Sequence, residues 1–407
     1  MSKNLGIGFV TGRSNVCKII NSYYEDMLKQ TSEYDVKLTI YILYDLHYLN
    51  TKVEEFYKIN SEVLDKINIK YITPEVIENE MKFIASKTNL TEQDTKLIFG
   101  NGHAKGRNTI MYFAYKEKMD YLLFWDDDEY PVANIKNANE IIWKKQNNIS
   151  KHLNYISDAD VTIGYHCGYI SPIPYININN DINENILKKY IEAISNDILS
   201  WDSFKNKMQL NYGISYADEK ILNSELSYEI PIQGAGKWVS GSTLCLNLNH
   251  IDKIPAFYNP PEARGEDTFF STMLDDSKVI KVPVYHFHDG FLKYTDIMDG
   301  KFPNKLEKID NSHDNIVKRF FSASRGWIRY KPLLMYISDP EQYDENIKLV
   351  YEQLNDSIPG INKLFKNFDF TELIDNLEEY DKNVKVHYEQ YQRTNAIWEF
   401  LKDYLHS

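Results

Sequence analysis

The chain has 407 residues, of which 43% are hydrophobic and 26% are charged. This composition excludes a mostly disordered chain, and the length predicts one large domain with an appendage, or two domains. The net charge of −13 excludes the basic surface that binds a nucleic-acid backbone. No apolar stretch reaches the roughly 18 residues of a membrane helix, and the N-terminus lacks a signal-peptide pattern, so we expect a cytoplasmic protein. Three distant cysteines (Cys17, Cys167 and Cys245) predict neither a disulfide framework nor a thiolate zinc site.

Strand and helix patterns alternate through the first 130 residues. Short apolar runs predict strands, and an amphipathic period predicts the helices between them. We expect strands at 5–10, 37–44, 69–72 and 121–125, and helices at about 16–27, 52–66 and 105–118. Such alternation predicts an α/β fold with a mostly parallel sheet and helices on both faces. Ligands of such sheets bind at the carboxyl ends of the strands.

The rest of the chain divides into an irregular middle and a helical end. Strands are expected at 160–171, 238–248 and 278–288, and the last of these places His286 and His288 on one face. Beyond Gly300, helical spacing begins with Leu306 and Ile309 and continues to the C-terminus. We therefore predict an α-helical appendage over residues 301–407.

Three adjacent carboxylates, Asp126, Asp127 and Asp128, follow the fully apolar strand YLLFW. Adjacent carboxylates repel one another, so such a cluster needs either a bound cation or a solvated turn. Oxygen ligands suit Mg²⁺ or Mn²⁺. In an extended segment Asp126 and Asp128 would face the same way, with Asp127 opposed. The pattern favours a metal–diphosphate site, and a solvated turn capped by acids is the alternative.

A glycine-rich segment, GNGHAKGRN, precedes the predicted helix at 105–118. Lys105 and Arg107 stand at the N-terminal end of that helix, where free N–H groups and the helix dipole also attract phosphate. The spacing is not that of a Walker loop. The segment indicates a phosphate site, with a glycine-rich loop carrying a solvated arginine as the alternative.

Two segments in the second half carry titratable groups. Glu266 and Asp267 precede an apolar helical run, where they could favour the helix dipole or act as a general base. His288 lies nearer the strand end than His286, and a neutral imidazole can ligate Mn²⁺ together with carboxylates. The histidines without a partner motif are interpreted as structural, namely His103, His166 and His313.

The segment KWVSGSTLCLN is expected to form a strand with small residues and one tryptophan. Gly241 and Ser242 would leave room for a ligand, and Trp238 would offer a stacking face. A tight sheet crossing with the tryptophan in the core explains the pattern equally well.

Taken in order, these motifs resemble those of the GT-A glycosyltransferases, particularly family-2-like enzymes. The shared features are the strand followed by Thr11-Gly12-Arg13, the helix start Gly106-Arg107-Asn108, the strand ending in Asp126–Asp128, the segment Ser240–Ser242, the pair Glu266-Asp267, and His288. The resemblance covers about residues 3–295. It implies a GT-A domain over 1–300, with a nucleotide-binding half at 1–130 and an acceptor half at 131–300. The QxxRW motif of processive synthases is absent, so we expect transfer of single sugars.

The resemblance also implies roles for individual residues. Asp126 would lie near the ribose and the metal, and Asp128 would ligate Mn²⁺ or Mg²⁺ with His288. Asp267 would be the general base of an inverting transfer, with Glu266 orienting hydroxyl groups. The residues expected to bind the nucleotide sugar are Thr11, Gly12, Arg13, Asp45, Lys105, Arg107, Asn108, Asp126, Asp127, Trp238, Gly241 and Ser242.

The expected partners are a nucleotide-sugar donor and a glycan, protein or small-molecule acceptor. One alternative is a nucleotidyltransferase acting on a sugar phosphate, which would release pyrophosphate rather than a nucleoside diphosphate. The other is a non-catalytic carbohydrate-binding scaffold, which would bind no sugar nucleotide in a metal-dependent way. For the C-terminal helices we expect acceptor recognition or homodimerisation.

Overall fold

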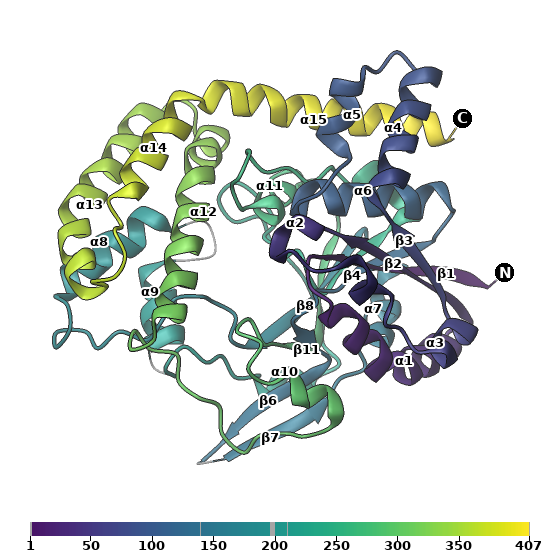
Figure 1. Ribbon diagram of the computed structural model, residues 1–407, viewed down its shortest axis with the longest axis horizontal. Helices are drawn as coiled ribbons and strands as arrows, with labels where there is room; N and C mark the ends of the chain where they lie inside the picture. The colour runs from purple at the N-terminus through teal and green to yellow at the C-terminus, as the bar shows by residue number, and fades with distance from the viewer. Residues whose placement is uncertain (1, 139, 196–199, 210, 407) are drawn as a thin grey trace.

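The computed structural model describes residues 2–138, 140–195, 200–209 and 211–406. Within these residues, nine strands form one central sheet in the order β3-β2-β1-β4-β10-β8-β11-β5, with β9 paired to β11. Six of the nine strands run in the same direction (β1, β2, β3, β4, β8 and β11), and the other three run against them. The predicted mixed, mostly parallel α/β sheet is therefore confirmed (Figure 1).

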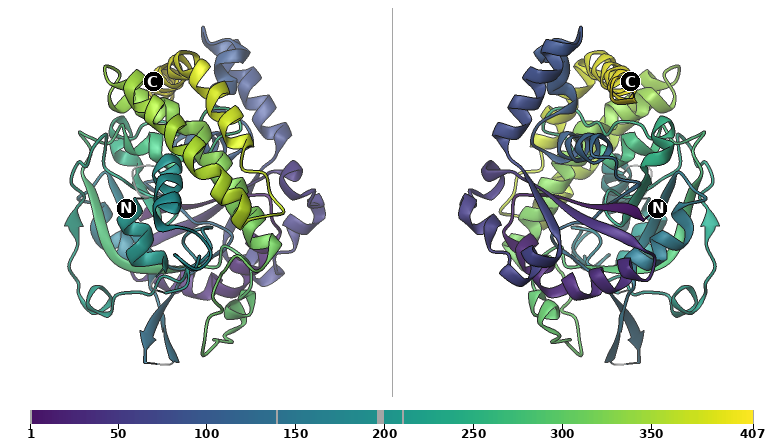
Figure 2. Two further views of the ribbon diagram at one scale, coloured as in Figure 1. Left: turned by 90° about the vertical axis from the view of Figure 1, so that its left-hand side faces the viewer. Right: turned by 90° about the vertical axis from the view of Figure 1, so that its right-hand side faces the viewer.

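The strands of the central sheet are β1 (Lys3–Thr11), β2 (Val36–Tyr44), β3 (Asn68–Ile72), β4 (Tyr121–Phe124), β5 (Glu129–Tyr130), β8 (Val161–Gly168), β9 (Tyr228–Glu229), β10 (Leu244–Asn247) and β11 (Val279–His288). A separate antiparallel hairpin consists of β6 (Val132–Asn137) and β7 (Glu140–Lys145). This hairpin projects from the sheet on the side opposite the last helix (Figures 1 and 2).

Helices cover the sheet and continue into the C-terminal region. In the first 156 residues they are α1 (Asn15–Ser32), α2 (Leu46–Leu49), the 3-10 helix η1 (Val53–Tyr57), α3 (Ser61–Lys66), α4 (Pro74–Lys87), α5 (Glu92–Ile98), α6 (His103–Lys116) and α7 (Asn148–Ile156). They continue with α8 (Glu184–Ile194), α9 (Trp201–Ser203), η2 (Phe204–Gln209), α10 (Glu219–Asn223), η3 (Leu248–Lys253), α11 (Glu266–Ser271) and η4 (Thr295–Asp299). The C-terminal helices are α12 (Asp314–Ser338), α13 (Tyr343–Leu364), α14 (Glu372–Lys382) and α15 (Val384–His406).

The register of the parallel strands brings their carboxyl ends to one edge. Thr11 at the end of β1 pairs with Tyr44 at the end of β2, and Gly8 pairs with Phe124 at the end of β4. All three strands are buried, so their apolar sequences pack on both faces, as expected for parallel strands. The polar residues that follow β1, β2 and β4 therefore lie side by side.

The helix expected over 52–66 is interrupted between Tyr57 and Ser61. The amide of Asn21 on α1 donates to Lys58 O at 3.0 Å, and its oxygen accepts from Asn60 N at 2.9 Å. Ile59 is buried between these two contacts. These tertiary hydrogen bonds hold the backbone of 58–60 outside a helix, and local periodicity contains no sign of them.

The strand expected over 238–248 is also shorter than predicted, because only Leu244–Asn247 pairs as β10. Thr243 has a φ of 48°, which is incompatible with a strand. Ser240 Oγ closes the preceding turn by donating to Ser242 O at 3.0 Å. Gly241 and Ser242 therefore lie in a turn, not on a strand.

The helical C-terminal region is confirmed, although its first helix begins at Asp314, so Leu306 and Ile309 precede it. Helices α12, α13 and α14 share a hydrophobic core with α8 and α9 from the middle of the chain. Helix α15 leaves this bundle and runs along the top of the molecule to α5 (Figures 1 and 2). No helix among the described residues has the length and apolar character that crossing a bilayer requires.

A buried tryptophan helps to anchor helix α15 to the sheet domain. Trp398 is fully buried, and its Nε1–H donates to Ile254 O at 2.9 Å. We expect Trp398→Phe to lower the free energy of unfolding by about 1–3 kcal/mol, because it removes buried volume and the shorter of the two hydrogen bonds to Ile254 O, the other coming from Lys402 Nζ at 3.5 Å. Urea denaturation would measure this loss, and Phe400→Leu, at a 39% exposed position on the same helix, should change stability by less than about 1 kcal/mol.

Candidate active site

The three aspartates after β4 lie in a turn. The indole Nε1–H of Trp125 donates to Glu129 O at 2.9 Å and closes the turn, so that β5 can pair with β11. Asp127 Oδ1 and Asp128 Oδ2 both accept from Arg13 Nη1 at 2.8 Å. The expected alternation, with Asp127 opposed to its neighbours, is therefore wrong: Asp127 and Asp128 share one partner.

The segment after β1 supplies the other wall of this corner. Thr11 Oγ1 accepts from Arg13 N at 2.9 Å and donates to Asp127. Burial raises the pKa of Asp127 to about 7, with Arg13 opposing the shift and the charge of Asp128 adding to it. A further cation beside these two carboxyl groups would oppose this shift and keep both of them ionised.

These segments line a pocket at the sheet edge together with residues from α2 and the start of α6. Its lining residues are Val10, Thr11, Gly12, Arg13, Asp45, Tyr48, Gly102, His103, Asp126, Asp127 and Asp128. Asp45 caps α2 by accepting from His47 N at 2.9 Å, and Tyr48 packs against Gly12, where a Cβ would lie 2.4 Å from the Cβ of Tyr48. The Arg13 guanidinium lies 5.8 Å from the Tyr48 ring centroid. An aromatic ring, a carboxylate and backbone groups thus surround a space suited to a polar ring system.

His288, at the end of β11, faces Asp128. Its Nε2 lies 3.5 Å from Asp128 Oδ1, and its Nδ1–H donates to Tyr169 O at 2.7 Å. Although burial opposes it, the carboxylate of Asp128 raises the pKa of His288 to about 9. Burial likewise opposes ionisation of Asp128, but His288 and Arg13 hold its pKa below the usual value.

This pair fits a divalent cation. Tyr169 O fixes the Nδ1–H of His288, so release of the Nε2 proton would leave the Nε2 lone pair facing Asp128 and a metal. Two neighbouring ligands of an octahedral ion lie about 3 Å apart, close to the distance between Nε2 and the carboxylate oxygen. Mg²⁺ or Mn²⁺ held by one carboxylate and one imidazole would take its other ligands from phosphate and water.

Asp126 departs from the expected metal set. Its Oδ1 accepts from Arg107 Nη2 at 3.1 Å, on the other side of the turn from Arg13. Across the described part of the chain, no three His, Cys, Asp or Glu side chains gather closely enough to hold an ion. The structure brings together Asp128 and His288 of the expected ligands, and it pairs Asp126 with an arginine.

Arg107 is held rigidly beside Asp126. It is 3% exposed, its guanidinium lies 5.0 Å from the centroid of Phe124, and its Nε is 4.0 Å from Glu266 Oε1. A Cβ at Gly241 would lie 2.7 Å from Arg107 Nη2, so the glycine turn makes room for the guanidinium. Arg107 thus connects the acid turn after β4 to the acids that begin α11.

We expect Gly241→Ala to displace Arg107 and to weaken its contact with Asp126. The overlap should cost about 1–3 kcal/mol of stability and lower turnover of the natural substrate about tenfold or more. Urea denaturation and steady-state kinetics would measure the two effects. Gly234→Ala is the control, because no atom lies within 4 Å of the Cβ position of Gly234. The positive φ of residue 234 should cost this variant about 1–2 kcal/mol of stability through backbone strain.

The acids of α11 differ in their proton affinity. Burial raises the pKa of Asp267 to about 7, and the charge of Glu266 adds to this shift. Burial opposes ionisation of Glu266 too, but the charges of His103 and Arg107 hold its pKa below the usual value. Two adjacent carboxyl groups whose pKa values are driven apart in this way are typical of an acid–base site.

The other expected binding residues have different surroundings. Asn108 is fully buried, and its amide bonds both the N–H (2.7 Å) and the carbonyl (2.8 Å) of Phe257, so it fixes that loop. Lys105 is exposed and lies against Gly100. Trp238 donates to Gln233 O at 2.8 Å and packs beside Phe269 and Tyr330. The structure does not bring these three side chains to the pocket formed by Asp126–Asp128.

Sequence reasoning missed a buried carboxylate beside the aspartates. Glu129 is 2% exposed and accepts from Ser242 Oγ at 2.6 Å, and its two oxygens lie 2.9 Å from His166 Nε2 and 3.1 Å from His286 Nδ1. Although burial opposes it, the two histidines hold the pKa of Glu129 well below its usual range. This cluster fixes the turn from β4 to β5. The sequence feature that could have indicated it is the fourth acid, Glu129, directly after the three aspartates.

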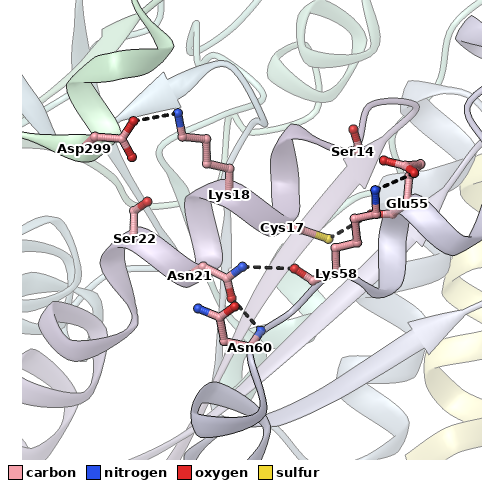
Figure 3. A pocket seen from close by; sticks show the side chains of 9 residues that line it. All are labelled: Ser14, Cys17, Lys18, Asn21, Ser22, Glu55, Lys58, Asn60 and Asp299. Atoms are coloured by element: carbon pink, nitrogen blue, oxygen red, sulfur yellow. Dashed lines mark hydrogen bonds and ion pairs between the residues drawn. The ribbon is translucent and has the colours of Figure 1, made fainter.

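A larger pocket of about 420 Å³ lies along α1 (Figure 3). Its charged groups are paired with one another, Lys18 with Asp299 at 3.1 Å and Lys58 with Glu55 at 2.6 Å. Asn21 is bonded to the backbone of 58–60, as described above. Its lining includes none of the residues that the sequence predicted for the site.

The chain was compared with family models, curated proteins and solved structures. No protein-family model and no curated protein matches the chain. Residues 1–349 of TarS from S. aureus match at 11% identity and a TM-score of 0.35, covering 94% of this chain and 91% of that one. A protein from Desulfovibrio desulfuricans G20 described as a nucleotide-diphospho-sugar transferase matches at 13% identity and a TM-score of 0.22, covering 41% and 59%. Mouse xyloside xylosyltransferase 1 matches at 9% identity and a TM-score of 0.27, covering 67% and 73%.

Proposed function

We propose that this protein is a metal-dependent glycosyltransferase that moves one sugar from a nucleotide-sugar donor to an acceptor hydroxyl. The observation that carries the proposal is the meeting of two features at one sheet edge. One is the Asp128–His288 pair beside Arg13, and the other is Asp267, whose pKa of about 7 suits a general base. Arg107 lies between the segments that carry them, 3.1 Å from Asp126 and 4.0 Å from Glu266.

On the donor side, we assign the nucleoside to the pocket formed by Thr11–Arg13, Asp45 and Tyr48. Ring stacking on Tyr48 and hydrogen bonds to a ribose by Asp45 would orient the donor. This arrangement directs the diphosphate toward Asp128 and His288 at the same strand ends. A divalent cation bound there would supply Lewis-acid stabilisation of the leaving diphosphate.

On the acceptor side, Asp267 would take the proton of the attacking hydroxyl. Such general-base catalysis contributes about 10²–10⁴ in rate. Glu266, kept ionised by Arg107 and His103, would accept a hydrogen bond from a sugar hydroxyl and orient it. Attack opposite the leaving group would invert the anomeric configuration.

A panel of sugar nucleotides with Mn²⁺ tests this function. A ligand that binds only the native state raises the melting temperature, and the increase grows with the ratio of ligand concentration to Kd. We expect one sugar nucleotide to raise Tm in the presence of Mn²⁺ and not with chelator, and to be hydrolysed slowly to nucleoside diphosphate and sugar. Release of pyrophosphate from a nucleoside triphosphate would instead identify a nucleotidyltransferase and contradict the proposal.

A further inference from the structure

Helix α12, from the C-terminal region, contacts both ends of the candidate site. One face of this helix carries Arg319, Ala323, Gly326 and Tyr330, at helical spacing. Near its start, Arg319 Nη2 would lie 2.7 Å from a Cβ on Gly290, two residues after His288. Farther along, Tyr330 would lie 2.9 Å from a Cβ on Gly265, which directly precedes Glu266. Helix α12 therefore packs directly against the segments that carry the expected metal ligand and the expected base.

Glycines permit this approach at each contact. The side chain of Arg264 crosses Gly326 of α12, and its Cγ would lie 2.7 Å from a Cβ there. The Arg264 amide also donates to Gly326 O at 3.4 Å. A side chain larger than hydrogen at Gly326 would separate the helix from the loop that leads into α11. Arg264 and Arg319 therefore both lie where α12 packs against the segments of the site.

Neither of these two guanidinium groups has a carboxylate within 4.0 Å among the described residues. Neighbouring arginines do: Arg325 pairs with Glu372 at 3.0 Å, and Arg329 pairs with Glu262 at 3.2 Å. Arg319 is half-buried and lies 4.7 Å from the ring centroid of Phe291. Burial lowers the pKa of Arg319, and the positive charges of Arg13 and Arg264 lower it further. The carboxylate of Asp128 opposes this decrease.

We propose that Arg319, with Arg264 beside it, binds the diphosphate of the nucleotide-sugar donor, so that α12 forms part of the active site. The proposal rests on the proposed glycosyltransferase function. A guanidinium presents a planar set of donors that matches phosphate oxygens. The Cβ position of Gly290 lies 2.7 Å from Arg319 Nη2 and 3.0 Å from His288 Cε1. Arg319 therefore lies at the His288 end of the site, which favours the donor diphosphate over an anionic acceptor.

In the transfer step, the bond between the anomeric carbon and the diphosphate oxygen breaks, and its electron pair stays on that oxygen. The acceptor oxygen forms the new bond to the anomeric carbon, and its proton passes to Asp267. Arg319 donates hydrogen bonds to the phosphate oxygens on which the charge accumulates. Because that charge is greater after cleavage than before it, Arg319 stabilises the departing diphosphate more than the intact donor.

Binding of Mn²⁺–pyrophosphate, measured by isothermal titration calorimetry, tests this role without knowledge of the base or the sugar. We expect Arg319→Ala to weaken binding about 10- to 100-fold, as the loss of charge-assisted hydrogen bonds predicts. Arg319→Lys should recover part of the affinity. Arg325→Ala, on the same helix and paired with Glu372, is the matched control and should bind within twofold of the wild type.

Asp128→Ala separates this inference from the proposed function. If Asp128→Ala loses pyrophosphate binding and Arg319→Ala does not, the inference is overturned and the proposed function stands. If neither variant changes binding, both are overturned. An Arg319→Ala protein that binds pyrophosphate normally but loses transfer would place the arginine on an anionic acceptor and would also overturn the inference. Should Arg319→Ala fail to fold, Arg319→Gln retains most of the side-chain volume and provides the same comparison.

Discussion

Replacing Asp128 by alanine should lower metal-dependent turnover of the sugar-nucleotide donor about 1,000-fold or more. Its carboxylate is the one that faces both His288 Nε2 at 3.5 Å and Arg13 Nη1 at 2.8 Å. Without it, the imidazole alone would have to hold the cation, and the several kcal/mol of Lewis-acid stabilisation would be lost. Hydrolysis of the donor identified by thermal shift, measured against Mn²⁺ concentration, provides the test.

The control for this change is Asp276→Asn, which removes an exposed carboxylate outside the site. It should leave both turnover and its Mn²⁺ dependence unchanged. Asp128→Ala should remain folded, because Arg13 keeps its ion pair with Asp127 at 2.8 Å. A folded Asp128→Ala protein with wild-type turnover would contradict the metal assignment.

Replacing Asp267 by asparagine should remove sugar transfer and leave donor binding intact. The expected loss is about 10²–10⁴-fold in kcat, the usual contribution of a general base. KM for the donor should change little, since Asp267 begins α11 and does not line the pocket between β1 and β4. A transfer rate equal to that of the wild type would show that another group accepts the proton.

The pH dependence of transfer provides an independent check on this residue. Burial raises the pKa of Asp267 to about 7, so the ionised base is depleted as the pH falls below 7. Wild-type transfer should therefore rise about tenfold per pH unit below 7 and level off above it. The transfer rate of the Asp267→Asn protein should not show this increase with pH. If the increase persists in the variant, it reports the ionisation of another group.

Much of the sheet could be predicted from the sequence, because buried parallel strands are continuous apolar runs. The strands at Leu5–Val10, Lys37–Tyr44 and Tyr121–Trp125 were located to within two residues. The interruption of the helix at 58–60 and the turn at 240–243 could not be predicted, because they depend on contacts from distant residues such as Asn21. Periodicity reports local preference, and tertiary hydrogen bonds override it.

The candidate site was predictable in its composition and only partly in its geometry. Thr11, Asp45 and the aspartates each follow a predicted parallel strand, at the carboxyl ends where ligands bind. The pairing of Asp126 with Arg107 could not be foreseen, since it depends on a turn that Trp125 closes through a side-chain hydrogen bond. Arg319 was missed because the last hundred residues contain no recognisable motif, and α12 reaches the site only through packing against glycines.

Coordination of Mn²⁺ by His288 is the central claim, and pulsed electron paramagnetic resonance tests it most directly. Inorganic pyrophosphate contains no nitrogen, so any nitrogen coupled to bound Mn²⁺ must come from the protein. With Mn²⁺ and pyrophosphate, the wild-type protein should show the echo modulation of one directly bound histidine nitrogen, and His288→Ala should abolish it. A wild-type spectrum without nitrogen modulation, or one that persists in His288→Ala, would contradict the account.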